Sequence, residues 1–352
     1  MASVEIDGRP IGGSPPRTFV IAELSANHGG SLDTALGIVR AAAEAGADAI
    51  KLQTYRPDTI TIDADTEPFR ISSGTVWDGR TMYELYEEAH TPWEWHAPIR
   101  DEALRLGMTW FSSPFDATAI DLLESLDVPA YKIASFEIVD VGLIRRVAAT
   151  GKPMVISTGM ATYDEIEEAV AAARDGGATD IALLKCTSAY PAPPDEVDLR
   201  TIPHMATAFG VPVGLSDHTM GIAVPVAAVA LGAVIVEKHV TLRRADGGPD
   251  SGFSLEPAEL AEMVAQIRVA EQALGSVSYT PTEREAPSRS LRRSLFVVDD
   301  VRAGEPFTEA NVRSIRPGHG LHTRHLPEIL GRHAARDVAR GTPLSWDLIA
   351  PA

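Results

Sequence analysis

Eight short apolar stretches, each followed by a segment of helical character, recur between residues 18 and 274 and limit the folds open to this chain. They are apolar along their whole length, which is typical of parallel strands buried on both faces. We expect these strands at residues 18–24, 48–53, 108–112, 130–134, 153–157, 180–186, 211–215 and 233–236. Eight strand–helix units in about 260 residues predict a (β/α)8 TIM barrel. A doubly wound open sheet is the alternative, but no G-x-G-x-x-G motif opens any of the turns.

The chain changes in character after the last predicted helix, 257–274. Residues 276–293 contain two prolines and several serines, and we interpret them as a linker. Residues 294–352 alternate short β-rich runs with Gly-containing turns, which predicts a small β-rich domain. A domain of about 60 residues has little core, so we expect it to dock on a partner surface. The expected division is therefore a barrel at 1–275, a linker at 276–293 and a small domain at 294–352.

Polar residues collect where the predicted strands end. In a barrel all these ends meet at one mouth, where barrel enzymes bind their substrates. Two histidines, His218 and His239, follow neighbouring strands there, which predicts a site for a divalent metal or a polar substrate. The strand ends carry Glu23, Ser25, Asn27 and His28; Lys51 and Gln53; Ser112 and Ser113; Lys132, Ser135 and Glu137; Ser157 and Thr158; Lys185, Thr187 and Ser188; Ser216, Asp217 and His218; and Glu237, Lys238 and His239.

The lysines are few and unevenly placed. The chain has five lysines against 26 arginines, and four of the five lie in or at the ends of predicted strands: Lys51, Lys132, Lys185 and Lys238. Ammonium groups near the mouth of an acidic protein indicate an anionic substrate. Serines and threonines at the same strand ends would add donors for a phosphate, which barrel mouths often bind.

Composition excludes several classes of protein. A net charge of −18 argues against nonspecific binding of nucleic acid. No apolar run approaches 18 residues and no signal sequence opens the chain, so we expect neither a membrane span nor secretion. The single cysteine, Cys186, excludes an internal disulfide and fits a reducing cytoplasm, and its apolar surroundings predict a buried, unreactive thiol.

The charge is divided unevenly along the chain. Residues 288–352 contain ten Arg and seven Asp or Glu, a net +3, which leaves −21 for the rest. A mildly basic tail beside an acidic body is consistent with an internal or inter-subunit contact, although solvated faces alone would give the same counts.

Motifs in a fixed order carry a family resemblance over nearly the whole chain. The runs IAELSANHGG, DAIKLQTY, FSSPFD, YKIAS with Glu137, ISTGMA, LKCTSAYP, GLSDHT and EKHVTL resemble the sialic acid synthase family. Members are phosphoenolpyruvate-condensing barrel enzymes with a C-terminal antifreeze-like (SAF, β-clip) domain, which SLFVV and NVRSIRPGHGL resemble here. The runs ELSANH, RPDTITI, TPWEWH and GGPDSGFSLEP are similar to the pseudaminic acid synthase branch of that family.

The resemblance implies a condensation of phosphoenolpyruvate with 2,4-diacetamido-2,4,6-trideoxy-altrose. The product would be a nine-carbon α-keto acid, and phosphate would leave by C–O cleavage. A divalent metal on His218 and His239, with Mn²⁺ first and Mg²⁺ or Co²⁺ as alternatives, would polarise the sugar aldehyde. The positions that would hold phosphoenolpyruvate are Lys51, Ser113, Lys132, Ser135, Ser157 and Ser216, with Ser113 where other members have Thr.

The remaining site residues are also implied by the resemblance. Glu137 would transfer the proton at the condensing carbons and Glu23 would position water or sugar, and the two roles could be exchanged. Tyr190 and Asp250 would contact the sugar, while Ser188 stands where the sialic acid branch has Asn. Arg316 matches the arginine that the antifreeze-like domain offers to a partner's active site, which implies a domain-swapped homodimer.

Other functions stay open on the sequence alone. Within the family, the chain could be an N-acetylneuraminate or legionaminic acid synthase. A metal-dependent sugar aldolase or isomerase would not need the lysine-and-serine set, and a non-catalytic carbohydrate- or ice-binding protein would not need the charged mouth. Glu137 and Asp250 could also be ordinary surface carboxylates, and Arg316 an ion-pair partner between domains. Trp77, Trp93 and Trp95 could pack the long second loop or cover the sugar.

Overall fold

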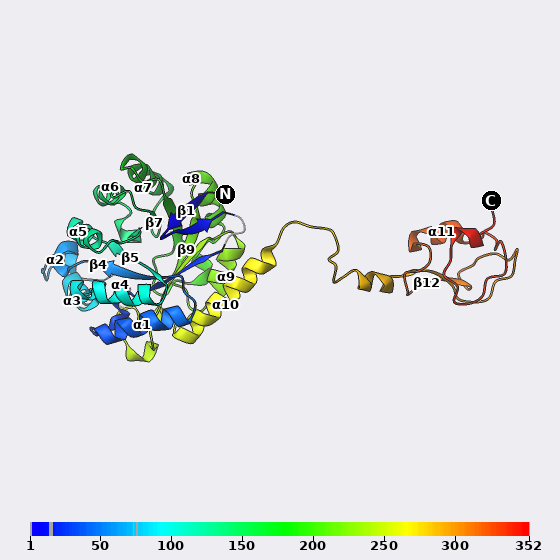
Figure 1. Cartoon of the computed structure of the whole chain (residues 1–352), viewed down its shortest axis with the longest axis horizontal. Helices are drawn as coiled ribbons and strands as arrows, with labels where there is room; N and C mark the ends of the chain where they lie inside the picture. The colour runs from blue at the N-terminus through cyan, green and yellow to red at the C-terminus, as the bar shows by residue number, and fades with distance from the viewer. Residues whose placement is uncertain (1, 14–16, 73, 75–76, 352) are drawn as a thin grey trace. The chain divides into compact units, whose positions relative to one another are not determined.

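The computed structural model describes residues 2–13, 17–72, 74 and 77–351. The chain divides into two compact units, Met1–Gly275 and Ser276–Ala352. In the first unit eight parallel strands close into a barrel in the order β10-β3-β4-β5-β6-β7-β8-β9, surrounded by helices (Figure 1). The strands are β3 (Phe19–Glu23), β4 (Ala49–Thr54), β5 (Thr109–Pro114), β6 (Tyr131–Ile133), β7 (Met154–Ser157), β8 (Ile181–Cys186), β9 (Val213–Asp217) and β10 (Ile235–His239). The predicted TIM barrel is confirmed.

Strands β9 and β10 end later than their apolar residues suggest. Parallel pairing joins Val236–Lys238 to Leu215–Asp217, so polar residues continue both strands. The same extension places His239 inside β10, where it pairs with Glu23 of β3. Because backbone pairing and not side-chain polarity ends these strands, a polar residue is a poor marker of the boundary.

Helices with ordinary start signals follow the strands. Ser31 caps α1 by accepting from the Thr34 amide, and Thr162 forms a capping box with Glu165 at the start of α7. The helices are α1 (Leu32–Glu44), α4 (His96–Arg105), α5 (Ala117–Ser125), α6 (Val141–Ala148), α7 (Tyr163–Asp175), α8 (Thr201–Phe209), α9 (Ala223–Ala230) and α10 (Pro257–Leu274). None of the helices in the described residues is both long and apolar enough to cross a membrane.

The described residues between β4 and α4 form short helices. These are α2 (Pro57–Ile60), η2 (Glu67–Phe69), α3 (Met82–Ala89) and η3 (Trp93–Trp95). Further 3-10 turns follow other strands: η1 (Ser25–His28), η4 (Ser135–Glu137), η5 (Pro194–Glu196), η6 (Arg244–Asp246) and η7 (Ser251–Phe253). Several of the predicted site residues lie in these turns, immediately beyond a strand.

An N-terminal hairpin of β1 (Ser3–Ile6) and β2 (Arg9–Gly12) precedes the barrel and was not among the predicted elements. Its turn is Asp7-Gly8, with φ of 53° and 69°, and such a dipeptide is a standard signal for a two-residue hairpin loop. The hairpin contacts the amino ends of the barrel strands, because Arg9 bonds Asp48 and the Asp7 carboxylate accepts from Thr109. It therefore covers that end of the barrel and leaves the carboxyl mouth to the loops.

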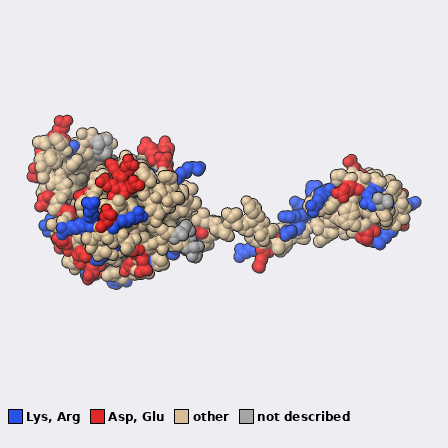
Figure 2. Space-filling view, turned by 90° about the horizontal axis from the view of Figure 1, so that it is seen from above, with Lys and Arg blue, Asp and Glu red and all other residues tan. Residues whose placement is uncertain are grey.

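The second unit has its own small core. Strands β11 (Ser294–Val297) and β12 (Val312–Ile315) pair antiparallel, and Leu295, Phe307 and Ile329 are buried beneath them. Short helices complete it: η8 (Pro287–Leu291), η9 (Thr323–His325), α11 (Leu326–Ile329) and η10 (Trp346–Leu348). Figure 2 shows basic side chains gathered where this unit begins, a region that includes Arg289, Arg292 and Arg293. The β-rich character expected for this part of the chain is confirmed.

Candidate active site

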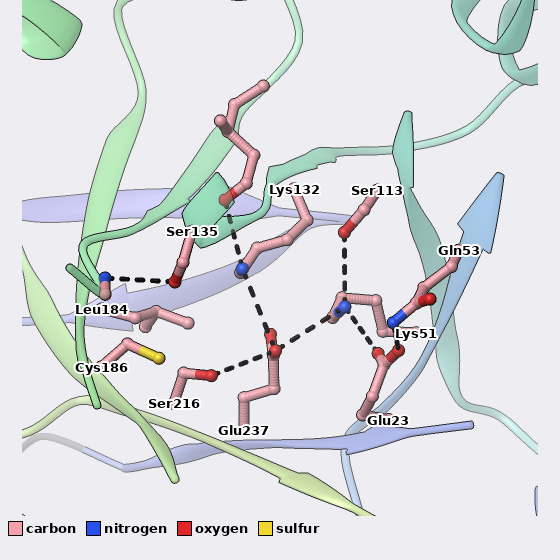
Figure 3. Close-up of polar contacts among 12 residues, drawn as sticks. Glu23, Lys51, Gln53, Ser113, Lys132, Ser135, Leu184, Cys186, Ser216 and Glu237 are labelled. Carbon is pink, nitrogen blue, oxygen red and sulfur yellow. Dashed lines mark hydrogen bonds and ion pairs between the residues drawn. The ribbon is translucent and has the colours of Figure 1, made fainter. Parts of the chain in front are cut away.

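A buried network of charged groups fills the carboxyl mouth of the barrel (Figure 3). Lys51 Nζ lies 2.6 Å from Glu23 Oε2 and 3.6 Å from Glu237 Oε1, and it donates to Ser113 Oγ at 3.3 Å. Gln53 Nε2 donates to the other oxygen of Glu23 at 3.1 Å. Strands β3, β4, β5 and β10 each supply one or more of these groups, so barrel closure brings them together.

Lys132 reaches the same network from the opposite wall. Its Nζ lies 3.9 Å from Glu237 Oε1, and Ser216 Oγ donates to that oxygen at 3.4 Å. The Ser135 hydroxyl accepts from the Gly159 amide at 3.1 Å. Ser157 Oγ is buried and has no hydrogen-bond partner among the described residues. The structure thus joins Lys51, Lys132, Ser113 and Ser216 in one network. Ser135 bonds Gly159, and the buried Ser157 hydroxyl is free to bond a ligand.

The three carboxylates at the mouth differ in their electrostatics. Burial raises the pKa of Glu23 to about 7; Lys51 opposes that shift and the charge on Glu237 adds to it. Burial acts on Glu237 in the same way, but Lys132 and Lys51 outweigh it and lower its pKa. Burial also raises the pKa of Glu137 to about 7. Glu237 is therefore held ionised, whereas Glu23 and Glu137 can exchange protons near neutral pH.

Glu137 and Asp250 lie in loops that leave both residues half-buried. Glu137 Oε2 is buried with no partner among the described residues, in the turn η4 directly after Ser135. The Asp250 carboxylate accepts from the Ser25 hydroxyl, and Gln53 donates to the same hydroxyl at 3.2 Å. Burial raises the pKa of Asp250 against that hydrogen bond. Neither group is an exposed surface carboxylate, but both are loop carboxylates, so their roles remain predictions.

The two predicted metal histidines are neighbours. Their ring centroids are 5.2 Å apart, and each ring is buried. His218 Nδ1 lies 2.9 Å from the Thr187 carbonyl oxygen, which can only accept, so Nδ1 carries a hydrogen and Nε2 is the nitrogen left for a metal. His239 Nδ1 is buried without a partner among the described residues, and burial lowers the pKa of this ring.

This donor set fits a divalent cation with open positions. Burial favours the neutral form of His239. Burial acts on His218 in the same way, but the Cys186 thiol and the Thr187 carbonyl outweigh it and raise the pKa, so a metal would compete with a proton for that ring. Two imidazoles leave coordination positions for substrate oxygens and water. The described residues contain no group of three or more His, Cys, Asp and Glu placed to hold an ion. A metal bound here would have His218 and His239 as its protein ligands, and its binding remains a prediction.

Aromatic rings cover the histidines. The Tyr190 ring lies 4.4 Å from His218, and the Phe253 ring lies 5.1 Å from His239. Burial raises the pKa of the Tyr190 hydroxyl. Tyr190 was predicted to contact the sugar, and its ring does border the histidine pair; Phe253 was not predicted.

Two of the four strand lysines lie outside this network. Lys238 Nζ bonds Asp217 Oδ2 at 2.5 Å and the Thr219 carbonyl oxygen. Lys185 Nζ bonds the Cys186 carbonyl oxygen at 3.0 Å. Successive side chains of a strand point to opposite faces, and both lysines neighbour a residue that points into the mouth. The interpretation of all four lysines as anion-binding groups was therefore wrong for these two.

Residues missed by the prediction complete the site. Glu237 and Gln53 were noted only as polar strand ends, yet one joins both lysines and the other joins Glu23 to Ser25. Gly159 was not singled out. A Cβ at this position would lie 2.1 Å from Ser188 Oγ and 2.7 Å from Ser135 Oγ, so only glycine lets this loop approach. Its place in the run STG directly after β7 was the available signal.

Two further residues named from the sequence are Cys186 and Arg316. Cys186 is buried, as expected, but it lies at the mouth, with Sγ 3.8 Å from His218 Nδ1. Its Sγ is also 3.7 Å from Ser188 Oγ. Arg316 belongs to the second unit, where it follows β12 and is exposed. Its assignment to a partner's active site remains a prediction.

Comparisons with known proteins agree with this arrangement. Residues 38–279 match the NeuB family and residues 292–350 match the SAF domain. The chain is 45% identical to a pseudaminic acid synthase of Campylobacter jejuni over 328 residues, covering 93% of this chain and 95% of that protein. It is 36% identical to an N,N'-diacetyllegionaminic acid synthase of Legionella pneumophila over 350 residues, covering 98% of each. A crystal structure of N-acetylneuraminic acid synthetase from Leptospira borgpetersenii superposes with a TM-score of 0.71 at 31% identity, covering 81% of this chain and 94% of that one.

Proposed function

The chain belongs to the NeuB family, the family of the sialic acid synthases, and carries a SAF domain, and from this premise we propose that it is a pseudaminic acid synthase. It would condense phosphoenolpyruvate with 2,4-diacetamido-2,4,6-trideoxy-altrose and release phosphate. The higher identity to the Campylobacter enzyme than to the Legionella one supports this branch.

The observation that carries the proposal is the network at the mouth. Lys51 and Lys132 lie on either side of Glu237, and hydroxyl groups of Ser113 and Ser216 complete the set. Glu23 and Glu237 face the two ammonium groups in the free protein, and a proton on Glu23, whose pKa lies near 7, would leave one positive charge for the phosphate and carboxylate of phosphoenolpyruvate. An aldolase or isomerase acting on a neutral sugar would have no use for two buried lysines lined by serines.

The residues can be assigned to steps of the reaction. The methylene carbon of phosphoenolpyruvate forms a bond to the sugar aldehyde carbon, and the aldehyde oxygen takes up a proton. We assign that proton to Glu137, because its buried Oε2 is unengaged and its pKa near 7 supplies the protonated form. Water then adds at the former enol carbon, and phosphate leaves as the C–O bond breaks to give the ketone.

Glu23 is placed for the hydration step. Its two oxygens are held by Lys51 and Gln53, so its orientation is fixed and its pKa is also near 7. A carboxylate in this state can take a proton from the attacking water. A divalent ion on His218 and His239, Mn²⁺ in our proposal with Mg²⁺ or Co²⁺ as alternatives, would polarise the aldehyde when bound.

The second unit would contribute a residue to the active site of a partner subunit. Arg316 carries an exposed guanidinium fork beside β12, and such a fork can bond an acetamido carbonyl oxygen. We therefore infer a domain-swapped homodimer in which each barrel mouth receives the partner's Arg316. The single cysteine fits a cytoplasmic location for this enzyme.

The deciding experiment offers the purified chain phosphoenolpyruvate with a panel of sugars, with Mn²⁺ present. We expect phosphate release and a nine-carbon α-keto acid, identified by mass and NMR, with 2,4-diacetamido-2,4,6-trideoxy-altrose as the preferred sugar. Preference for N-acetylmannosamine or for the legionaminic precursor would move the chain to another branch of the family. Sugar cleavage or isomerisation without use of phosphoenolpyruvate would refute the proposal.

A further inference from the structure

We propose that Trp77, with Tyr190 and Phe253, forms an apolar wall that receives the 6-deoxy end of the sugar and makes Trp77 a specificity-determining residue. The inference rests on the proposed function, because it names which part of that substrate the wall recognises. These three residues are called the aromatic wall below.

Two contacts attach Trp77 to the mouth. Its ring centroid lies 5.4 Å from that of Tyr190, in the loop after β8. Its indole Nε1 donates to the Pro249 carbonyl oxygen at 3.0 Å, in the loop after β10 and one residue before Asp250. The inserted segment after β4 is thereby joined to two loops far away in the sequence. Trp77 is half-buried, so part of the residue remains exposed to solvent.

The aromatic wall extends outward from the histidine pair. Tyr190 contacts His218 at 4.4 Å and Phe253 at 5.2 Å between ring centroids. Phe253 also lies 5.1 Å from His239. Trp77 contacts Tyr190 and is one ring farther from the histidines. An open-chain sugar whose aldehyde lies at the histidines would therefore reach Trp77 with its distal carbons.

The two sides of the mouth differ in chemistry. Lys51, Lys132 and Glu237 form the charged side, which suits the anionic substrate. The polar side-chain atoms of the aromatic wall are the Trp77 indole nitrogen, which donates to Pro249, and the Tyr190 hydroxyl, which is hydrogen-bonded with Ser188. A primary hydroxyl at this place would lose hydrogen bonds to water without replacement, whereas a methyl group would gain apolar contact. The wall therefore favours a sugar with a methyl group at C6.

The expected size of the effect is modest but measurable. Hydrophobic pockets separate substrates that differ by one small group by about tenfold to a hundredfold in kcat/KM. We expect the 6-deoxy sugar to be preferred by an amount in that range over a sugar that differs only in having a C6 hydroxyl.

The experiment measures this preference in the wild type and in two substitutions of Trp77. The two sugars are 2,4-diacetamido-2,4,6-trideoxy-altrose and its 6-hydroxy counterpart. Trp77→Gln keeps an amide donor for the Pro249 carbonyl oxygen but removes the ring; Trp77→Phe keeps a ring and removes the donor. We expect the preference to fall on the order of tenfold in Trp77→Gln, with an unchanged KM for phosphoenolpyruvate, and to stay within about twofold of wild type in Trp77→Phe.

Trp93→Phe is the matched control. Trp93 lies nearby in the sequence but stacks on Arg56 at 3.8 Å and donates to the Tyr55 carbonyl oxygen instead of contacting a ring of the aromatic wall, so its replacement should leave the ratio unchanged. Equal losses for both sugars in Trp77→Gln, or a parallel rise in the KM for phosphoenolpyruvate, would assign Trp77 a structural role and overturn the proposal. An unchanged ratio would overturn it too. If the wild type condenses neither sugar, the proposed function itself fails, and the wall fails with it.

Discussion

Replacing two buried lysines by methionine should separate the residues that hold the barrel together from those that bind substrate. The side chain of Lys238 is 0% exposed and that of Lys132 is 2% exposed, so burial does not distinguish them. Their partners do. Lys238 bonds Asp217 at 2.5 Å, whereas the nearest carboxylate oxygen to Lys132 is 3.9 Å away. We expect Lys238→Met to lower stability and Lys132→Met to raise the KM for phosphoenolpyruvate.

The magnitudes follow from what each change leaves behind. Lys238→Met leaves the Asp217 carboxylate, which is 1% exposed, with Thr219 as its only partner among the described residues. Breaking such a buried ion pair costs about 3–5 kcal/mol of stability. For a barrel of this size that lowers Tm by roughly 6–20 °C. Lys132→Met leaves Glu237 with Lys51 at 3.6 Å and with Ser216, so the free energy of unfolding should change little. Loss of its contact to substrate costs about 1.5–3 kcal/mol, a tenfold to hundredfold rise in KM.

Calorimetry of the barrel transition and steady-state phosphate release measure the two quantities on the same preparations. Lys152→Met is the control, because Lys152 pairs with Glu124 at 2.7 Å on the surface and such pairs contribute under about 1 kcal/mol. If Lys238→Met melts within about 2 °C of wild type, the buried pair does not stabilise the barrel as argued. If Lys132→Met keeps the wild-type KM, Lys132 does not bind phosphoenolpyruvate.

Three further predictions follow from the site. A chelator should abolish turnover, and Mn²⁺, Co²⁺ or Mg²⁺ should restore it. His218→Ala or His239→Ala should lower kcat by orders of magnitude with an unchanged circular dichroism spectrum. Full activity in metal-free protein would refute the metal assignment. Because the pKa of Glu137 is raised to about 7 and its proton is required, activity should fall as pH rises through that value, and Glu137→Gln should lower kcat about 10²–10⁴-fold and remove this limb from the residual activity. Mixing inactive His218→Ala with inactive Arg316→Ala chains should restore activity if subunit exchange is allowed, whereas a mixture that stays inactive despite forming mixed dimers would rule out the swapped arrangement.

The sequence by itself was sufficient to predict the barrel and most of the residues at its mouth. Uniformly apolar strands separated by helices are compatible with few folds other than a barrel. Because the carboxyl ends of the strands of a barrel converge, the sequence was sufficient to predict that Glu23, Lys51, Lys132, His218 and His239 lie together. The short motifs that carry the family resemblance lie at those same ends, which is why they also indicated the chemistry.

Only the tertiary structure decided which strand-end residues face the substrate and which groups share a proton or a charge. The sequence shows no alternation in a strand that is buried on both faces, so nothing in it separated Lys132, which faces the mouth, from Lys238, which bonds Asp217. The raised pKa of Glu137 and the contact of Trp77 with Tyr190 likewise depend on burial and on the path of loops. Burial and loop paths depend on which segments meet across the mouth, and the local sequence does not indicate contacts between segments so far apart in the chain.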